Sequence, residues 1–344
     1  MIAGIETCTG SAPTGWDDLV RRLGGTVFHS TLWAEYQRST RGVEPIYVLA
    51  RDASGRECAG TLALFRRSSR PLLSLVVRGL LLPSHPFTHE GDPATASDLV
   101  DHCERLARSR GCGSIRMDSF MSGQSPFLPT EHGYAETQRL EFCVDLSRDA
   151  ASLWQGIRKD QREKIRRLGR EGVIVDVGTT PEDLLALRSA RETTHARRSE
   201  RGQGYELSGD DLYENLFTYL VKQGAARLFV ARSRGEVIAA LFFVTFNGRA
   251  YSVFSGSTEA GYKLGAQSGL FWTAVETFKA EGFTELNRGG VPASAALEAD
   301  PLHGIYLFKL RLGTVPQVCR SGEKILSPLR HRLARLRRRL RGPR

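Results

Sequence analysis

Asp118 is the first residue whose position in the sequence suggests chemistry. It follows Ser114–Met117, a stretch that reads as a short strand. A carboxylate at the end of a strand can accept a proton from an amine or hold an ammonium group. An aspartate that only caps the turn at Asp118-Ser119 would give the same pattern, so both interpretations stay open.

Basic side chains form three groups along the chain. Arg197, Arg198 and Arg201 follow a predicted helix, and their guanidinium groups can bind a phosphate or carboxylate through paired hydrogen bonds. The same arginines could equally form a solvated loop. Residues 158–170 hold seven basic and two acidic side chains, and residues 328–344 hold eight arginines and no acid. The net charge of +10 therefore comes from two short segments, which indicates a polyanionic partner or surface.

Several common catalytic motifs are missing from the sequence. There is no G-x-S-x-G elbow and no Cys–His pattern of the kind that activates a thiol. The spacing of His85, His89 and His102 does not suit a metal site. The six cysteines contain no C-x-x-C pair, which predicts reduced thiols. We therefore expect neither a covalent nucleophile nor a metal or other cofactor.

One glycine-containing segment bears on whether the protein binds acyl-CoA. The usual pattern, Q/R-x-x-G-x-G/A at a helix start, places backbone N–H groups around a pyrophosphate. In Gly261–Gly269 the glycine is Gly265, but Tyr262 and Gln267 stand where the pattern requires other residues. The sequence therefore argues against CoA, although an altered anion site can remain.

The elements that position these residues occur twice. A helix ending at Gly111 precedes a strand, and so does a helix ending at Gly282, 171 residues later. His132-Gly133 and His303-Gly304 have the same offset, and each is expected to precede a strand. Hairpins around Gly55 and Gly235 add a third match. Together with the length of 344 residues, this predicts an α/β (α+β) protein made of two copies of one unit.

Two further segments read as helical. Residues 152–223 are expected to be largely helical, with Thr180 as an N-cap. In the tail, Leu329, Leu333, Leu336 and Leu340 mark one face of a basic amphipathic helix. The start of the chain lacks a secretion signal and no apolar run is long enough for a membrane span, so we expect a cytoplasmic protein. The basic tail adds a second expectation, which is peripheral contact with the inner membrane surface.

Several segments resemble the Fem family, which contains aminoacyl-tRNA-dependent peptidyltransferases. They are FHSTLWAEY (28–36), Trp154 with KDQREKIRRLGREGV (159–173), GSTEAGYKLGAQSGLFWTAVETFKAEG (256–282), LNRGG (286–290) and HGIYLFKLRLG (303–313). The resemblance implies two tandem GNAT-like domains with mixed sheets flanked by helices, of the compact type without a coiled-coil arm. It places the acceptor domain at 1–150, the aminoacyl-tRNA domain with a helical insertion at 151–316, and a segment returning to the first domain at 317–344.

The resemblance also implies roles for individual residues. Lys309, after Phe308, would place a positive charge near the donor ester or terminal ribose, whereas by residue type alone it could be a solvent-facing lysine on an edge strand. Asp118 resembles the family's acidic residue near the acceptor. The expected substrate-binding residues are Phe308, Trp33, Gln37, Arg38, Arg197, Arg198 and Tyr262, and the expected tRNA-binding residues are Arg158, Lys159, Arg162, Lys164, Arg166 and Arg167.

The expected reaction is transfer of an amino acid from charged tRNA to an amine, either of a peptidoglycan precursor or of a natural product or peptide. Gln37 stands near the position where peptidoglycan-type members have a diphosphate-binding lysine, which puts a nucleotide-diphosphate acceptor in doubt. The main alternative is an acyl-CoA-dependent N-acyltransferase acting on a sugar or small amine. A non-catalytic module that binds nucleic acid or an anionic membrane through the tail is the third hypothesis.

Overall fold

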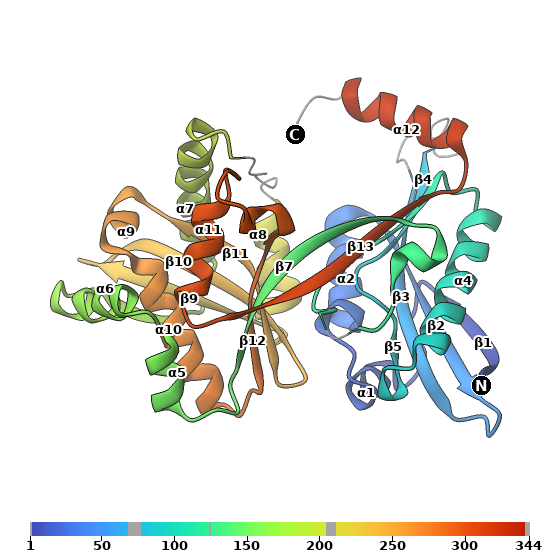
Figure 1. The fold of residues 1–344 in the computed structure, drawn as a ribbon, viewed down its shortest axis with the longest axis horizontal. Coiled ribbons are helices and arrows are strands. Elements are labelled where there is room, and N and C mark those ends of the chain that lie inside the picture. The colour runs from blue at the N-terminus through green and yellow to red at the C-terminus, as the bar shows by residue number, and fades with distance from the viewer. Residues whose placement is uncertain (1, 68–76, 124, 204–210, 341–344) are drawn as a thin grey trace. The chain divides into compact units, whose positions relative to one another are not determined.

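A computed structural model describes residues 2–67, 77–123, 125–203 and 211–340, with the backbone alone described at 211 and 335–340. These residues form two compact units. The first contains Met1–Gln138 together with Cys319–Arg344, and the second contains Arg139–Val318. Figure 1 gives the labels of the helices and strands.

The first unit is a mixed sheet with helices on its faces. Its strand order is β1-β2-β3-β4-β6-β13, and β5 pairs with β3. Strand β4 is parallel to β6, while the other pairings are antiparallel. The strands are β1 (Ile2–Thr9), β2 (Glu44–Asp52), β3 (Glu57–Arg67), β4 (Arg78–Leu82), β5 (Phe87–Thr88), β6 (Ser114–Met117) and the end of β13 (Val315–Ile325). The helices are α1 (Trp16–Arg22), α2 (Thr31–Arg41), α4 (Pro93–Ser109) and α12 (Pro328–Leu340).

The second unit repeats this arrangement. Its strand order is β7-β12-β11-β10-β9-β8, and β11 is parallel to β12 while the others are antiparallel. The strands are β7 (Ala135–Asp145), β8 (Ile174–Gly178), β9 (Ala226–Ser233), β10 (Glu236–Phe246), β11 (Arg249–Ser257) and β12 (Glu285–Pro292). The helices are α5 (Ala150–Gly156), α6 (Lys159–Arg170), α7 (Pro181–Glu200), α8 (Asp211–Leu216) with a π-helical turn (Phe217–Val221), α9 (Glu259–Leu264), α10 (Ala266–Ala280) and α11 (His303–Leu310).

Most of the predicted duplication is present. Gly111 and Gly282 have φ values of 67° and 80° and follow α4 and α10, and each is followed by the strand that adds to the sheet in parallel. The hairpin turns at Gly55 and Gly235 also have positive φ, a conformation that glycine adopts without strain. The order of antiparallel strands, helix and parallel strand is therefore common to both units.

The match between His132-Gly133 and His303-Gly304 was wrong for the second unit. His132-Gly133 precedes β7, but His303 begins helix α11. Ile305 and Tyr306 pack beside Phe142, whereas Phe308 packs against the main core of the second unit. Because α11 lies between two apolar clusters, its sequence is apolar on two sides and lacks a clear helical period, so it resembles a buried strand.

The segment 152–223 is not only helical. Strand β8 lies within it and pairs with β9, and the expected first helix is two helices separated at Ile157. The predicted cap is confirmed, because Thr180 Oγ1 accepts a hydrogen bond of 3.3 Å from Asp183 N at the start of α7. Since β8 forms the edge of the sheet, much of this segment belongs to the architecture of the second unit.

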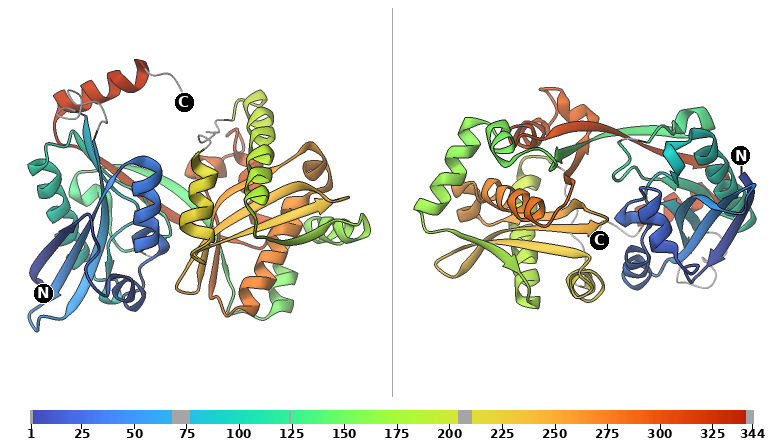
Figure 2. Two further views of the ribbon diagram at one scale, coloured as in Figure 1. Left: turned by 180° about the vertical axis from the view of Figure 1, so that it is seen from behind. Right: turned by 90° about the horizontal axis from the view of Figure 1, so that it is seen from below.

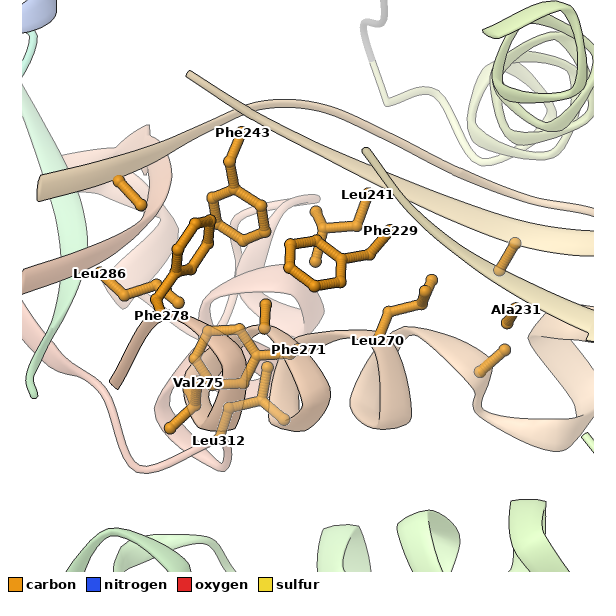
Figure 3. Packing of buried hydrophobic residues seen from close by; sticks show 14 of the residues in the cluster. Phe229, Ala231, Leu241, Phe243, Leu270, Phe271, Val275, Phe278, Leu286 and Leu312 are labelled. Carbon is orange, nitrogen blue, oxygen red and sulfur yellow. The ribbon is translucent and has the colours of Figure 1, made fainter. Parts of the chain in front are cut away.

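The core of the second unit lies between its sheet and α10. Leu270, Phe271 and Phe278 of α10 are fully buried against the strands, as Figure 3 shows. The ring of Phe278 lies 5.3 Å from that of Phe243 in an edge-to-face arrangement. Helix α7 covers the opposite face of the sheet, as the right-hand view in Figure 2 shows. Because both faces of this sheet are covered, the sequences of its strands are nearly continuous apolar runs.

The first unit has a separate core. Leu99, Val100 and Cys103 of α4 pack against Ile46 and Val48 of β2. All six cysteines carry free thiols. None of the helices that the structure describes has the length and hydrophobicity needed to span a membrane.

Candidate active site

Lys309 is buried in the second unit, so the interpretation as a solvent-facing lysine on an edge strand was wrong. It lies on α11 with 8% of its surface exposed. Its Nζ donates to the carbonyl oxygens of Arg288 and Gly290, at 3.1 and 3.2 Å, and lies 5.3 Å from the centre of the Phe142 ring. A lysine held by backbone oxygens in an apolar environment is rare, and this makes it the centre of the candidate site.

A bulge in β12 presents these two carbonyl groups to Lys309. The pairing with β7 shifts between Asn287 and Gly290, leaving one extra residue on β12. Gly289 within the bulge has a φ of 72°, and a Cβ there would lie 2.9 Å from the carbonyl oxygen of Ser252. Only glycine fits both the backbone conformation and the space. The LNRGG sequence therefore encodes the local geometry that holds the lysine.

Glu141 organises a second group of buried polar side chains beside the bulge. It is fully buried on β7 and accepts hydrogen bonds from Tyr251 Oη at 3.0 Å and Asn287 Nδ2 at 2.8 Å. Arg139 lies 3.5 Å from the same carboxylate and donates to Tyr251 Oη. Because a buried carboxylate is costly without partners, these contacts fix three strands relative to one another at the site.

Arg288 adds a second buried cation. Its terminal nitrogens donate to Ser252 Oγ at 3.0 Å and Gln267 Oε1 at 2.9 Å. The Nε atom has no hydrogen-bond partner among the residues that the structure describes. Burial lowers the pKa of Arg288 to about 10. The guanidinium therefore stays charged at neutral pH and contributes a fixed positive potential.

This potential acts on Lys309. Burial, followed by the nearby charges of Arg288 and Arg139, lowers the pKa of Lys309 well below its ordinary value, while Glu141 opposes the shift. Arg198 also contributes to the lowering of this pKa. An amine with a lowered pKa exchanges its proton more readily at neutral pH than a surface lysine does, so Lys309 can accept or donate a proton during a reaction.

The parallel ladder between β11 and β12 ends at the level of this site. Its pairing covers only Arg249–Tyr251 with Glu285–Asn287. Both strands continue beyond these residues, β11 to Ser257 and β12 to Pro292. Backbone groups beyond the end of a ladder are where an extended ligand can add hydrogen bonds to a sheet.

The structure brings the expected residues of α7 and α9 into the same unit as Lys309. Arg197 lies over the ring of Tyr262, 4.2 Å from its centre, and 3.5 Å from Glu259. A hydrogen bond from Arg201 lowers the pKa of Tyr262. Phe308 packs against the core. Arg197 and Arg198 lie inside α7, and not in a loop after it, because the helix continues to Glu200.

The six expected tRNA contacts lie on or next to α6, and they have different surroundings. Arg162 donates to the carbonyl oxygens of Trp154 and Gln155, and Arg167 donates to that of Lys263, so both cap the C-terminal ends of neighbouring helices. Lys164 packs against Gly265. The others are exposed, with Arg166 lying over the ring of Trp154; they are Arg158, Lys159 and Arg166.

The remaining candidates lie in the first unit. Trp33 and Gln37 are buried in α2, and the indole Nε1 of Trp33 lacks a hydrogen-bond partner in the described part of the chain. Arg38 forms an ion pair of 2.7 Å with Glu35. Asp118 directly follows β6, as expected, and pairs with Arg116 at 2.6 Å.

Sequence reasoning missed most of the buried polar group around Lys309. Glu141, Tyr251, Asn287 and Arg288 were not among the expected site residues. The signal that was available is the presence of polar residues inside apolar strands, in RLEFCV and ELNRGG. No cluster of metal-ligating side chains occurs in the part of the chain that the structure describes.

Comparisons with known proteins agree with this fold. A family model described as "Acetyltransferase (GNAT) domain" matches residues 155–295. The crystal structure of FemX superposes with a TM-score of 0.73 at 15% identity, covering 95% of this chain and 99% of that one. The chain has the tandem GNAT fold of FemX. The fold expected from the Fem resemblance is therefore confirmed.

Two further solved structures share this fold. L-PGS from Bacillus licheniformis gives a TM-score of 0.55 at 18% identity, covering 97% of this chain and 98% of that one. A tandem GNAT protein from the clavulanic acid biosynthesis pathway gives 0.53 at 14% identity, covering 94% and 99%. The search of curated proteins gave no match. The comparisons thus show an acyltransferase fold of the GNAT and Fem type, with the family-model match over the unit that contains Lys309.

Proposed function

We propose that this protein transfers an aminoacyl group from tRNA to an amine and forms an amide bond. The observation that carries the proposal is Lys309, a buried lysine with a lowered pKa at a bulge where the ladder of two parallel strands ends. The FemX fold supports it. Further support comes from a neighbour named as a putative lysylphosphatidylglycerol synthetase, from Agrobacterium fabrum, at a TM-score of 0.55.

The reaction needs no covalent intermediate. The nitrogen of the acceptor amine attacks the ester carbonyl, the C–N bond forms, and the bond to the ribose oxygen breaks. One proton must move from the attacking nitrogen to the ribose oxygen. In our proposal Lys309 accepts this proton as a neutral amine and returns it to the leaving oxygen, and in its charged form it stabilises the oxyanion. Burial, together with the nearby charge of Arg288, lowers the Lys309 pKa and thus favours the neutral form.

The surface of α6 is the proposed contact for the tRNA backbone. Arg158, Lys159 and Arg166 are exposed, so their charged groups can reach phosphates. Arg162 and Arg167 would act mainly by holding α6 against its neighbours. In the first unit, Asp118 and the residues on α2 remain the proposed contacts for the acceptor.

Acetyl-CoA as donor is the second candidate, because the matching family model describes an acetyltransferase domain. The structure offers an argument against it. Gln267, at the start of α10, donates from its side-chain nitrogen to the carbonyl oxygens of Ala240 and Gly256 and accepts from Arg288. A residue fixed in this way makes the segment after Gly265 part of the protein's own network, which differs from an open pyrophosphate loop.

Equilibrium binding distinguishes the two donors. The probes are bulk tRNA charged with labelled amino acids, the same tRNA after deacylation, and acetyl-CoA, at near-physiological salt so that nonspecific phosphate binding is weak. We expect a preference for charged tRNA that Lys309→Met reduces and that Lys222→Met, on an exposed lysine of the same unit, leaves unchanged. Saturable binding of acetyl-CoA with no preference for charged tRNA would overturn the proposal.

A further inference from the structure

Helix α12 has exposed leucines on its surface. Leu329 is 70% exposed and Leu333 is 43% exposed, and their spacing of four places them on one face of the helix. Arg330, His331 and Ala334 are partly buried instead. A surface helix normally turns its apolar face toward the core, so α12 is oriented the opposite way and its leucine face has no cover in the described part of the chain. Leu336 and Leu340 lie outside the described side chains.

The contacts of α12 with the first unit explain this orientation. Arg330 donates to the carbonyl oxygen of Gly111 at 2.5 Å, at the end of α4. Just before the helix, the backbone N–H groups of Leu326 and Ser327 donate to the carbonyl oxygen of Gly113. Leu326 itself packs against the core of the first unit. The helix, seen after β13 in Figure 1, is thus fixed by a polar residue and the preceding turn.

The sequence of α12 combines these exposed leucines with positive charge. Residues 328–340 contain six arginines and no acidic residue. Beside the Arg330 contact, a hollow of about 260 Å³ is lined by Glu44, Phe65, Arg67, Arg78 and Arg110. Glu44, the one acid in this lining, is paired with Arg110 at 2.6 Å. Arg78 donates to the carbonyl oxygen of Arg110, so the arginines of the hollow and the start of α12 form one basic surface around Gly111.

We infer that α12 and this hollow form a docking surface for an anionic phospholipid bilayer. A basic amphipathic helix binds such a surface by placing its apolar face at the boundary of headgroups and acyl chains while its cations meet the lipid phosphates. Nucleic acid would use the arginines but would gain nothing from exposed leucines. The combination of both features therefore favours lipid, and this inference does not depend on the reaction proposed above.

Vesicle binding by the full chain tests the inference. The probe is a vesicle of phosphatidylcholine with about a third phosphatidylglycerol, set against phosphatidylcholine alone. We expect the double variant Leu329→Ser/Leu333→Ser to lower the partition coefficient on anionic vesicles by about tenfold or more. The matched control is Leu185→Ser/Leu297→Ser, because these leucines of the second unit are similarly exposed, at 53% and 66%.

Three results would overturn it. Equal binding of the double variant and the wild type to anionic vesicles would show that the leucines do not enter lipid. If anionic vesicles are not bound and Arg330→Gln/Arg332→Gln weakens binding of bulk tRNA, the surface belongs to nucleic acid. If the wild type is a dimer by light scattering without lipid and the leucine variant is a monomer, a second copy covers this face. All the substituted residues are at least partly exposed, so the variants should fold normally. Thermal unfolding like that of the wild type confirms that each variant is folded.

Discussion

Replacing Lys309 by methionine should change the stability of the second unit in a way that depends on pH. Methionine keeps an unbranched apolar chain beside Phe142 but removes the amine. In the unfolded chain the lysine stays protonated up to about pH 10.4. In the folded protein it releases its proton at lower pH, because burial and Arg288 lower its pKa. Between the two pKa values the unfolded state binds more protons, so wild-type stability should rise with pH.

The magnitude follows from linkage. Within that window the wild-type free energy of unfolding should increase by about 1.4 kcal/mol per pH unit, and the methionine variant should lack this slope. At high pH the variant should be less stable, since it loses the hydrogen bonds to the carbonyl oxygens of Arg288 and Gly290, each contributing about 1 kcal/mol. As pH falls the difference should shrink and then reverse, because only the wild type must bury an ammonium group.

Urea denaturation between about pH 7 and pH 10 would measure this. Hydrogen exchange of peptides from α10 and β12 reports the second unit separately from the first. Lys222→Met serves as the control and should follow the wild-type slope, since Lys222 is exposed. Parallel pH profiles for the wild type and Lys309→Met would refute the reasoning, because they would mean that Lys309 titrates at the same pH in the folded and unfolded chain.

Two further substitutions test the local geometry. Gly289→Ala should destabilise the second unit by about 2–3 kcal/mol, because the φ of 72° is strained for alanine and its Cβ would lie 2.9 Å from the carbonyl oxygen of Ser252. The control in denaturant titrations is Gly282→Ala, since Gly282 has a similar φ but open space around it. An equal loss of stability in both variants would exclude the steric cause. Thr180→Ala should lower the free energy of unfolding by about 1 kcal/mol through loss of the α7 cap, and Thr180→Ser should retain most of the stability of the wild type. Equal melting temperatures for the wild type and both variants would contradict the capping role.

The architecture could be predicted because its signals are local. Gly111 and Gly282 end helices in both copies, and a strand follows each of them at the same distance. The end of a helix at a glycine with positive φ depends on a few neighbouring residues, so it can be predicted from the sequence. Helix α11 could not be read in this way, since the two apolar clusters on its sides hide the helical period.

The surroundings of Lys309 were not predictable because they depend on contacts between distant residues. Asn287 and Glu141 are 146 residues apart in the sequence, but Asn287 Nδ2 lies 2.8 Å from Glu141 Oε2. Their meeting requires the antiparallel pairing of β7 with β12 and the shift at Gly289, and a shift of one residue would turn Glu141 to the other face of the sheet. The Fem resemblance selected Lys309, but only the structure shows that Arg288 lies beside it as a second buried cation.

The two copies differ at the position of the bulge, and this bears on where the chemistry takes place. At the offset of 171 residues Asp118 corresponds to Gly289, but the repeat does not extend to Lys309, because Lys309 lies on helix α11 whereas the chain at that offset is strand β7. Asp118 pairs with Arg116. The first unit therefore lacks, at this position, the glycine that forms the bulge of the second, although it shares the fold. Since a buried lysine costs stability that the fold itself does not require, the presence of Lys309 beside the bulge of β12 supports the proposal that acyl transfer is carried out by the second unit.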